Sequence, residues 1–140
     1  MIAKKKRYYV KRENLQVNAI AKPLKPTFSQ AVKVQARSFL FISGQVAFDK
    51  SNKIVGKGDA AAQTRQLLEN MRAILESVDA SFDNVVKVTV FLKDMKDFED
   101  VHKVRAKYFK NQPPASTLVQ IGQLVHPDIL VEIEAIAALE

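Results

Sequence analysis

Two carboxylates near the C-terminal end of the chain are the first residues that could carry chemistry. Glu132 and Glu134 interrupt the apolar run LVEIEAIA at residues 130–137. The run alternates as a β-strand does, and successive strand side chains point to opposite faces, so both glutamates lie on one face. Carboxylates placed together can hold a water molecule or a proton in a site, and they can equally serve a contact between subunits. The alternation leaves both roles open.

A second polar group ends the apolar run at residues 38–48. Ser43 and Gln45 point the same way, with Gly44 between them. Their hydroxyl and amide groups can bond within the sheet or contact a ligand. The chain has no cysteine, and its two histidines lie in different segments. We therefore expect no zinc site, no metal and no cofactor.

The elements that must position these residues follow from periodicity and from capping residues. Strands are expected over residues 28–34, 38–48, 84–92, 116–121 and 129–137, with one helix from Asp59 to about Val78 and a second from Asp94 or Asp97 to about Phe109. This order predicts an α+β fold in which two helices cover one face of a mixed β-sheet. One small chain cannot cover the other face, so we expect self-association.

The charge is unevenly distributed. The net charge is +7, but residues 1–12 hold six basic residues and no acid, which leaves 16 basic against 15 acidic residues, or +1, over the rest. We predict a basic N-terminal arm over 1–25 and a domain over 26–140. RNA could bind the arm through its cations and through Tyr8 and Tyr9, although a nearly neutral domain argues against RNA as the main partner.

Length and composition restrict the class of protein. The chain has 140 residues, 47% of them hydrophobic, which fits one domain with a real core. No apolar run reaches the roughly 18 residues that a membrane helix needs, and the charged N-terminus is not followed by an apolar signal segment. We therefore expect no membrane partner and a cytoplasmic location.

Five stretches carry a resemblance that covers nearly the whole domain. FSQAV, FISGQV, QTRQLLENMRAILE, VVKVTVFLKDMKDFEDV and EIEAIA occur in this order between residues 26 and 138. In sequence and spacing they resemble the RidA/YjgF family of enamine and imine deaminases, some of which carry an older endoribonuclease label. The resemblance implies a chorismate-mutase-like fold assembled as a homotrimer. It also implies clefts between subunits that bind small carboxylate or carbonyl metabolites.

The resemblance further implies a set of site residues. Glu132 would position the attacking water. The arginine that holds the substrate carboxylate in the family is replaced by Ser116, the usual tyrosine by Phe28 and the usual asparagine by His102. The other expected substrate contacts are Ser43 and Gln45. Arg105, on the second helix, is expected to be solvated rather than to replace the missing cation.

Three functions remain as hypotheses. The first is hydrolytic deamination of 2-enamine or 2-imine intermediates to 2-keto acids and ammonia, with weak standard activity because Ser116 lacks a guanidinium. The second is a non-catalytic, ligand-sensing or chaperone-like trimer. The third is RNA binding or endoribonuclease activity through the basic arm.

Overall fold

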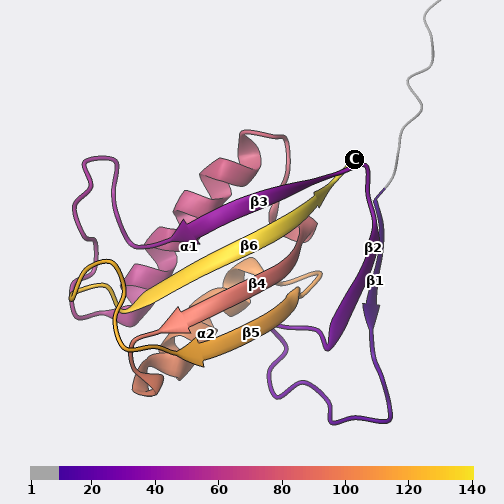
Figure 1. The fold of residues 1–140 in the computed structure, drawn as a ribbon, viewed down its shortest axis with the longest axis horizontal. Coiled ribbons are helices and arrows are strands. Elements are labelled where there is room, and N and C mark those ends of the chain that lie inside the picture. Colours follow the sequence, from indigo (N-terminus) through magenta and orange to yellow (C-terminus); the bar gives the residue numbers. More distant parts are fainter. Residues whose placement is uncertain (1–9) are drawn as a thin grey trace, which may run out of the picture.

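The computed structural model describes residues 10–140 as one α+β unit (Figure 1). Its elements are β1 (Lys11–Leu15), β2 (Ala31–Gln35), β3 (Ser38–Gln45), α1 (Ala60–Glu76), β4 (Val85–Leu92), α2 (Phe98–Tyr108), β5 (Ala115–Gln120) and β6 (Val131–Leu139). Short 3-10 turns, Phe82–Asn84 and Met95–Asp97, precede β4 and α2. In the described part of the chain, neither helix has the length and apolarity needed to cross a membrane.

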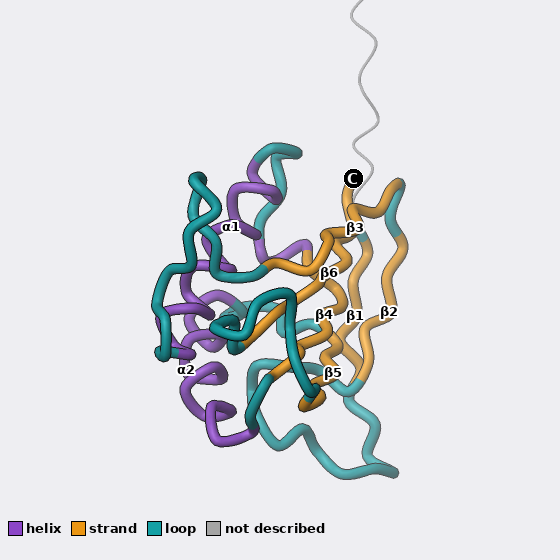
Figure 2. The backbone as a smooth tube through the Cα atoms, turned by 60° about the vertical axis from the view of Figure 1, so that its left-hand side comes forward, coloured by secondary structure: helices purple, strands orange, loops and turns teal. Residues whose placement is uncertain are grey.

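The main sheet is mixed, as the sequence predicted. Its strand order is β3-β6-β4-β5, with β4 and β5 parallel and the other pairs antiparallel. Both helices lie against one face (Figures 1 and 2). Between the helices and this face lies the core, in which Val88, Val90 and Ile133 of the sheet and Leu67 and Met71 of α1 are fully buried. The predicted α+β fold is confirmed.

The helix starts follow the capping residues that the sequence offered. The Asp59 carboxylate accepts a hydrogen bond from the Ala62 amide at 2.9 Å, which satisfies one of the free N–H groups at the start of α1. Of the two candidate caps of the second helix, only Asp94 makes a capping hydrogen bond. Asp94 accepts from the Lys96 amide and starts the 3-10 turn, whereas Asp97 precedes α2 without a capping side-chain bond.

The sheet face opposite the helices is open in a single chain. Phe41 is 75% exposed and Phe39 46% exposed on β3, and Val119 is 40% exposed on β5. Large exposed apolar side chains gathered on one face favour a contact with another chain. The sequence predicted that this face would lack a cover within one subunit.

Part of the predicted N-terminal arm is built into the fold. Lys11–Leu15 form β1, which pairs antiparallel with β2, so residues 11–15 do not project as an arm. The reason is Arg12, whose guanidinium donates to the carbonyl groups of Asp83, Val85 and Gln112 at 2.7–2.9 Å and of Pro113 at 3.2 Å. The basic run at residues 4–7, with Tyr8 and Tyr9, lies outside the described residues.

Candidate functional site

A cavity of about 400 Å³ lies between α2, the start of β5 and the segment that precedes β2. Its lining residues are Leu24, Lys25, Thr27, Phe28, Met95, Phe98, His102, Arg105, Ser116 and Leu118. Three predicted ligand contacts, Phe28, His102 and Ser116, therefore come together here. The lining is mainly apolar, with a few polar groups that could orient a ligand.

Ser116 faces α2 and meets a cation there. It is paired in register with Val88, whose side chain is buried beneath the helices. The Nη2 atom of Arg105 donates a hydrogen bond to Ser116 Oγ at 3.1 Å. The prediction of a solvated Arg105 was wrong, because Arg105 is only 3% exposed and lines this cavity. It lies four residues after the buried Val101, on the same helix face.

The guanidinium of Arg105 has few partners for a buried charge. Burial lowers its pKa to about 10, which leaves it protonated at neutral pH. Its Nε is buried without a hydrogen-bond partner, and the group lies 5.9 Å from the centre of the Phe109 ring. Lys25, the other cation that lines the cavity, pairs with Glu99 at 2.9 Å. Within residues 10–140, no carboxylate pairs with Arg105 in the same way.

His102, on α2, contacts the segment that precedes β2. Its Nδ1 lies 3.0 Å from the hydroxyl of the buried Thr27, and its ring stacks on Phe98 with centroids 6.1 Å apart. The pKa of His102 is lowered, first by burial and then by the nearby cations Lys25 and Arg105. The ring is therefore neutral at pH 7. Thr27 was not singled out in the sequence, since a lone threonine after a proline carries no distinctive signal.

The predicted catalytic carboxylate lies on the other side of the sheet. Glu132 is on β6 between the buried residues Val131 and Ile133, so its side chain points away from the helices. Burial, and secondly the neighbouring Glu134, raise the pKa of Glu132 above its ordinary value of 4.5. A carboxylate with a raised pKa is a better proton acceptor in its ionised form than an ordinary glutamate.

A register shift in β3 brings Gly44 against this carboxylate. The β3–β6 pairing shifts between Ile42 and Gln45, which indicates a bulge. A Cβ atom on Gly44 would lie 1.9 Å from Glu132 Oε1, so only glycine leaves room for the carboxylate where it is. Ser43 and Gln45 flank this contact, and Gln45 Nε2 donates to the Ser43 carbonyl at 3.1 Å. Ser43, Gly44 and Glu132 thus gather in one place, whereas the bulge pairs Gln45 in register with Ile133, which is buried under the helices. The prediction that Ser43 and Gln45 point the same way was wrong for this reason.

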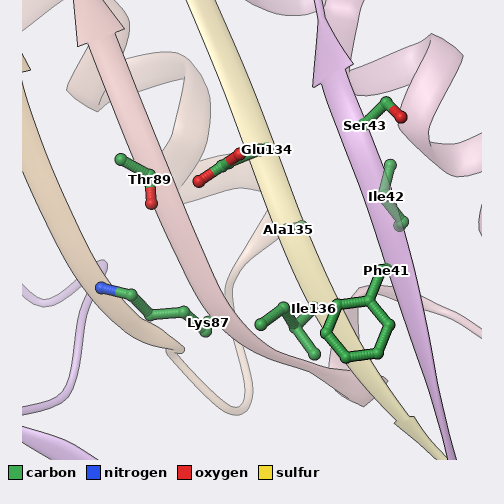
Figure 3. Close-up of a pocket in the computed structure, with 8 residues that line it drawn as sticks. All are labelled: Phe41, Ile42, Ser43, Lys87, Thr89, Glu134, Ala135 and Ile136. Carbon is green, nitrogen blue, oxygen red and sulfur yellow. The ribbon is translucent and has the colours of Figure 1, made fainter.

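Beside them, the open sheet face has a concavity of about 380 Å³ (Figure 3). It is lined by Phe41, Ile42, Ser43, Lys87, Thr89, Glu134, Ala135 and Ile136. Glu134 therefore faces the open side together with Ser43, and Lys87 Nζ donates to Thr117 Oγ1 at 2.8 Å. In the described chain no three His, Asp or Glu side chains are grouped to hold a metal ion.

One chain does not bring the six predicted residues to one place. Ser116 faces the helices, whereas Glu132 faces away from them, and β4 lies between their strands. The candidate site thus consists of two halves: a cavity half (Phe28, His102, Arg105 and Ser116) and a carboxylate half (Ser43, Gly44 and Glu132). Within one chain the two halves lie on opposite faces of the sheet.

Comparison with known proteins gives the family. The family model described as Endoribonuclease L-PSP matches residues 19–139. A RutC family protein of Pyrococcus horikoshii is 49% identical over 119 residues, which are 85% of this chain and 91% of that protein. The Rid family protein YyfB of Yersinia pestis has a similar structure, with a TM-score of 0.85 and 28% identity over 91% of this chain and 98% of that chain.

A further solved structure agrees with these matches. Yeast Mmf1 has a TM-score of 0.69 and 33% identity, over 93% of this chain and 100% of that one. The family match covers the cavity half and the carboxylate half of the site alike. The chain belongs to the RidA/YjgF family, whose model is described as Endoribonuclease L-PSP.

Proposed function

We propose that this protein is a cofactor-free hydrolase that converts small 2-imino acids to 2-oxo acids and ammonia. The observation that carries the proposal is the carboxylate of Glu132, which has a raised pKa and lies over Gly44 on the open sheet face. A carboxylate whose pKa is raised in this way can accept a proton from water as a general base. Membership of the RidA/YjgF family supports the same class of reaction.

The reaction needs little from the protein beyond positioning. Water adds to the C=N carbon, with Glu132 accepting one of its protons. That proton is returned to the nitrogen, which gives a carbinolamine. The hydroxyl proton then moves to the nitrogen by way of Glu132 as the C–N bond breaks, so that ammonia leaves and a 2-oxo acid remains. The acceleration over spontaneous hydrolysis comes from holding the imine carbon beside an oriented water molecule. A substrate of this class carries a carboxylate that the protein must also hold.

We also propose that the working form is a homotrimer in which each site is shared. One subunit would supply the cavity half and its neighbour the carboxylate half. Two observations support this: the exposed apolar side chains on the open sheet face, Phe41 above all, and the separation of the two halves within one chain. Sedimentation at micromolar concentration tests the assembly, and a stable monomer would overturn it.

Turnover tests the reaction itself. A 2-imino acid generated in situ by an amino acid dehydratase hydrolyses spontaneously, so the measurement is the rate of ammonia release above that background. We expect the wild-type protein to accelerate ammonia release and Glu132→Gln to remove this acceleration. Glu134→Gln, which changes the neighbouring carboxylate on the same strand face, should retain most of the acceleration. Equal losses in both variants would assign the carboxylates to the subunit contact instead. Ligand binding without turnover would favour a sensing role.

A further inference from the structure

We infer that Arg105, delivered from helix α2, is the anchor for the ligand's carboxylate, and that the ligand is a monoanion with an apolar side chain. The inference takes the class of ligand from the proposed function, but its geometry stands on the cavity. Arg105 lines the cavity, is 3% exposed and is protonated at neutral pH. Among the described residues its guanidinium bonds only to Ser116 Oγ.

A buried guanidinium without an anion is costly to keep. Taking a charge out of water is compensated only when an opposite charge and further hydrogen bonds replace the solvent. Here one neutral hydroxyl and one aromatic ring are the observed partners, and Nε is left without any. A carboxylate in the cavity supplies what is missing, since its two oxygens match the planar fork of a guanidinium.

Ser116 completes the anchor as a second donor. Its Oγ accepts the hydrogen bond from Arg105 Nη2, which leaves its own hydroxyl proton available for an oxygen of the ligand. Ser116 on β5, although uncharged, therefore still takes part in holding the anion. The cation comes from the helix, and the strand contributes a neutral donor beside it.

The rest of the lining determines what accompanies the carboxylate. Leu24, Phe28, Met95, Phe98 and Leu118 form an apolar wall around most of the cavity. Lys25 also lines it, but Glu99 already neutralises this cation. A second negative charge on the ligand would thus find no free cation among the described lining residues. The cavity favours 2-oxo and 2-imino acids with aliphatic or aromatic side chains over dicarboxylates.

The test is equilibrium binding of a stable product-like acid, so that it does not depend on turnover. The full-length protein is titrated calorimetrically with 4-methyl-2-oxopentanoate. Arg105→Met keeps the volume and removes the charge, and we expect binding to weaken about 10- to 150-fold. Lys107→Met removes one charge from an exposed position of the same helix and is the matched control, with binding unchanged. Arg105→Lys keeps the charge without the planar fork and should fall between the two.

Two further ligands separate the parts of the inference. The neutral ketone 4-methyl-2-pentanone should bind at least tenfold more weakly than the acid to the wild-type protein, and equally weakly to Arg105→Met. The dicarboxylate 2-oxoglutarate should bind more weakly than the acid. Unchanged affinity in a folded Arg105→Met protein, or no measurable binding of the acid to the wild-type protein, would overturn the anchor. Binding that depends on Arg105 without ammonia release from imines would retain the anchor and reject the proposed reaction.

Discussion

Arg105 Nη2 lies 3.1 Å from Ser116 Oγ, although the two residues are on different elements, α2 and β5. The contact places a cation beside a strand position at which the sequence offers only a hydroxyl. The cavity thus holds a guanidinium although position 116, where the family arginine would stand, has none.

We now predict that Ser116→Arg weakens ligand binding. Two guanidinium groups would occupy adjacent places in a poorly solvated cavity, where like charges repel strongly. The double variant Arg105→Met/Ser116→Arg should bind 4-methyl-2-oxopentanoate better than either single variant, because one cation is again present. Calorimetric titration of the three variants checks the prediction. Additive losses in the double variant would show that position 116 cannot carry the anchor.

Subunit mixing tests the shared site. Arg105→Met damages only the cavity half and Glu132→Gln only the carboxylate half. If each site takes one half from each of two neighbours, random mixing of the two inactive variants in trimers restores about one quarter of the intact sites. Imine hydrolysis by co-refolded mixtures measures this recovery. Mixtures as inactive as their components would place both halves of the working site within one chain.

Gly44→Ala should impair turnover with little effect on folding. The added methyl group would meet the end of the flexible Glu132 side chain, which can move aside, so the main loss is the position of the carboxylate. We expect kcat to fall at least about tenfold, in line with the usual contribution of a positioned base. Gly122→Ala is the matched control, because no atom lies within 4 Å of a Cβ there.

The pH dependence of turnover should carry the signature of Glu132. Its pKa is raised above 4.5, so the active, ionised form is lost as pH falls through a value higher than that of an ordinary glutamate. The acid limb of kcat/KM should therefore lie above pH 4.5. The sign for stability is opposite, because the folded state holds this proton more tightly and loses stability as pH rises through the same range. Glu132→Gln should remove the effect on stability. Glu134→Gln, which removes the second cause of the raised pKa, should move the acid limb of kcat/KM toward lower pH without removing turnover.

Arg12→Met should destabilise the fold. The variant leaves the carbonyl groups of Asp83, Val85, Gln112 and Pro113 without their shared donor. We expect a loss of about 1–3 kcal/mol in the free energy of unfolding, typical of removing one partner from such bonds. Chemical denaturation measures it. Lys11→Met, at the exposed neighbouring position of the same strand, should have little effect.

The strands and helices could be predicted because buried positions recur along the sequence with the period of a strand or a helix. The alternation at 130–137 placed Glu132 and Glu134 on the face opposite Val131 and Ile133, as the structure has them. The exposure of Arg105 was predicted wrongly, because an arginine on a helix is expected to be solvated unless the residues packed around it are known. Likewise, Arg12 was assigned to an arm, since the carbonyl groups that hold it lie some 70 to 100 positions away in sequence.

The division of the site between the two sheet faces could not be read from the sequence at all. Periodicity shows which side chains share a face within one strand. It does not relate the faces of β5 and β6, which are separated by β4 in the sheet. That relationship appears only once the strand order and register are known.

The attachment of β1 has a practical consequence for expression. The family match begins at residue 19, so a chain trimmed to that boundary would lack both β1 and Arg12. Strand β2 would then lose its antiparallel neighbour and present bare N–H and C=O groups to other molecules. Unpaired strands of this kind recruit further chains and promote aggregation. A soluble truncated protein would therefore need to begin ahead of Lys11.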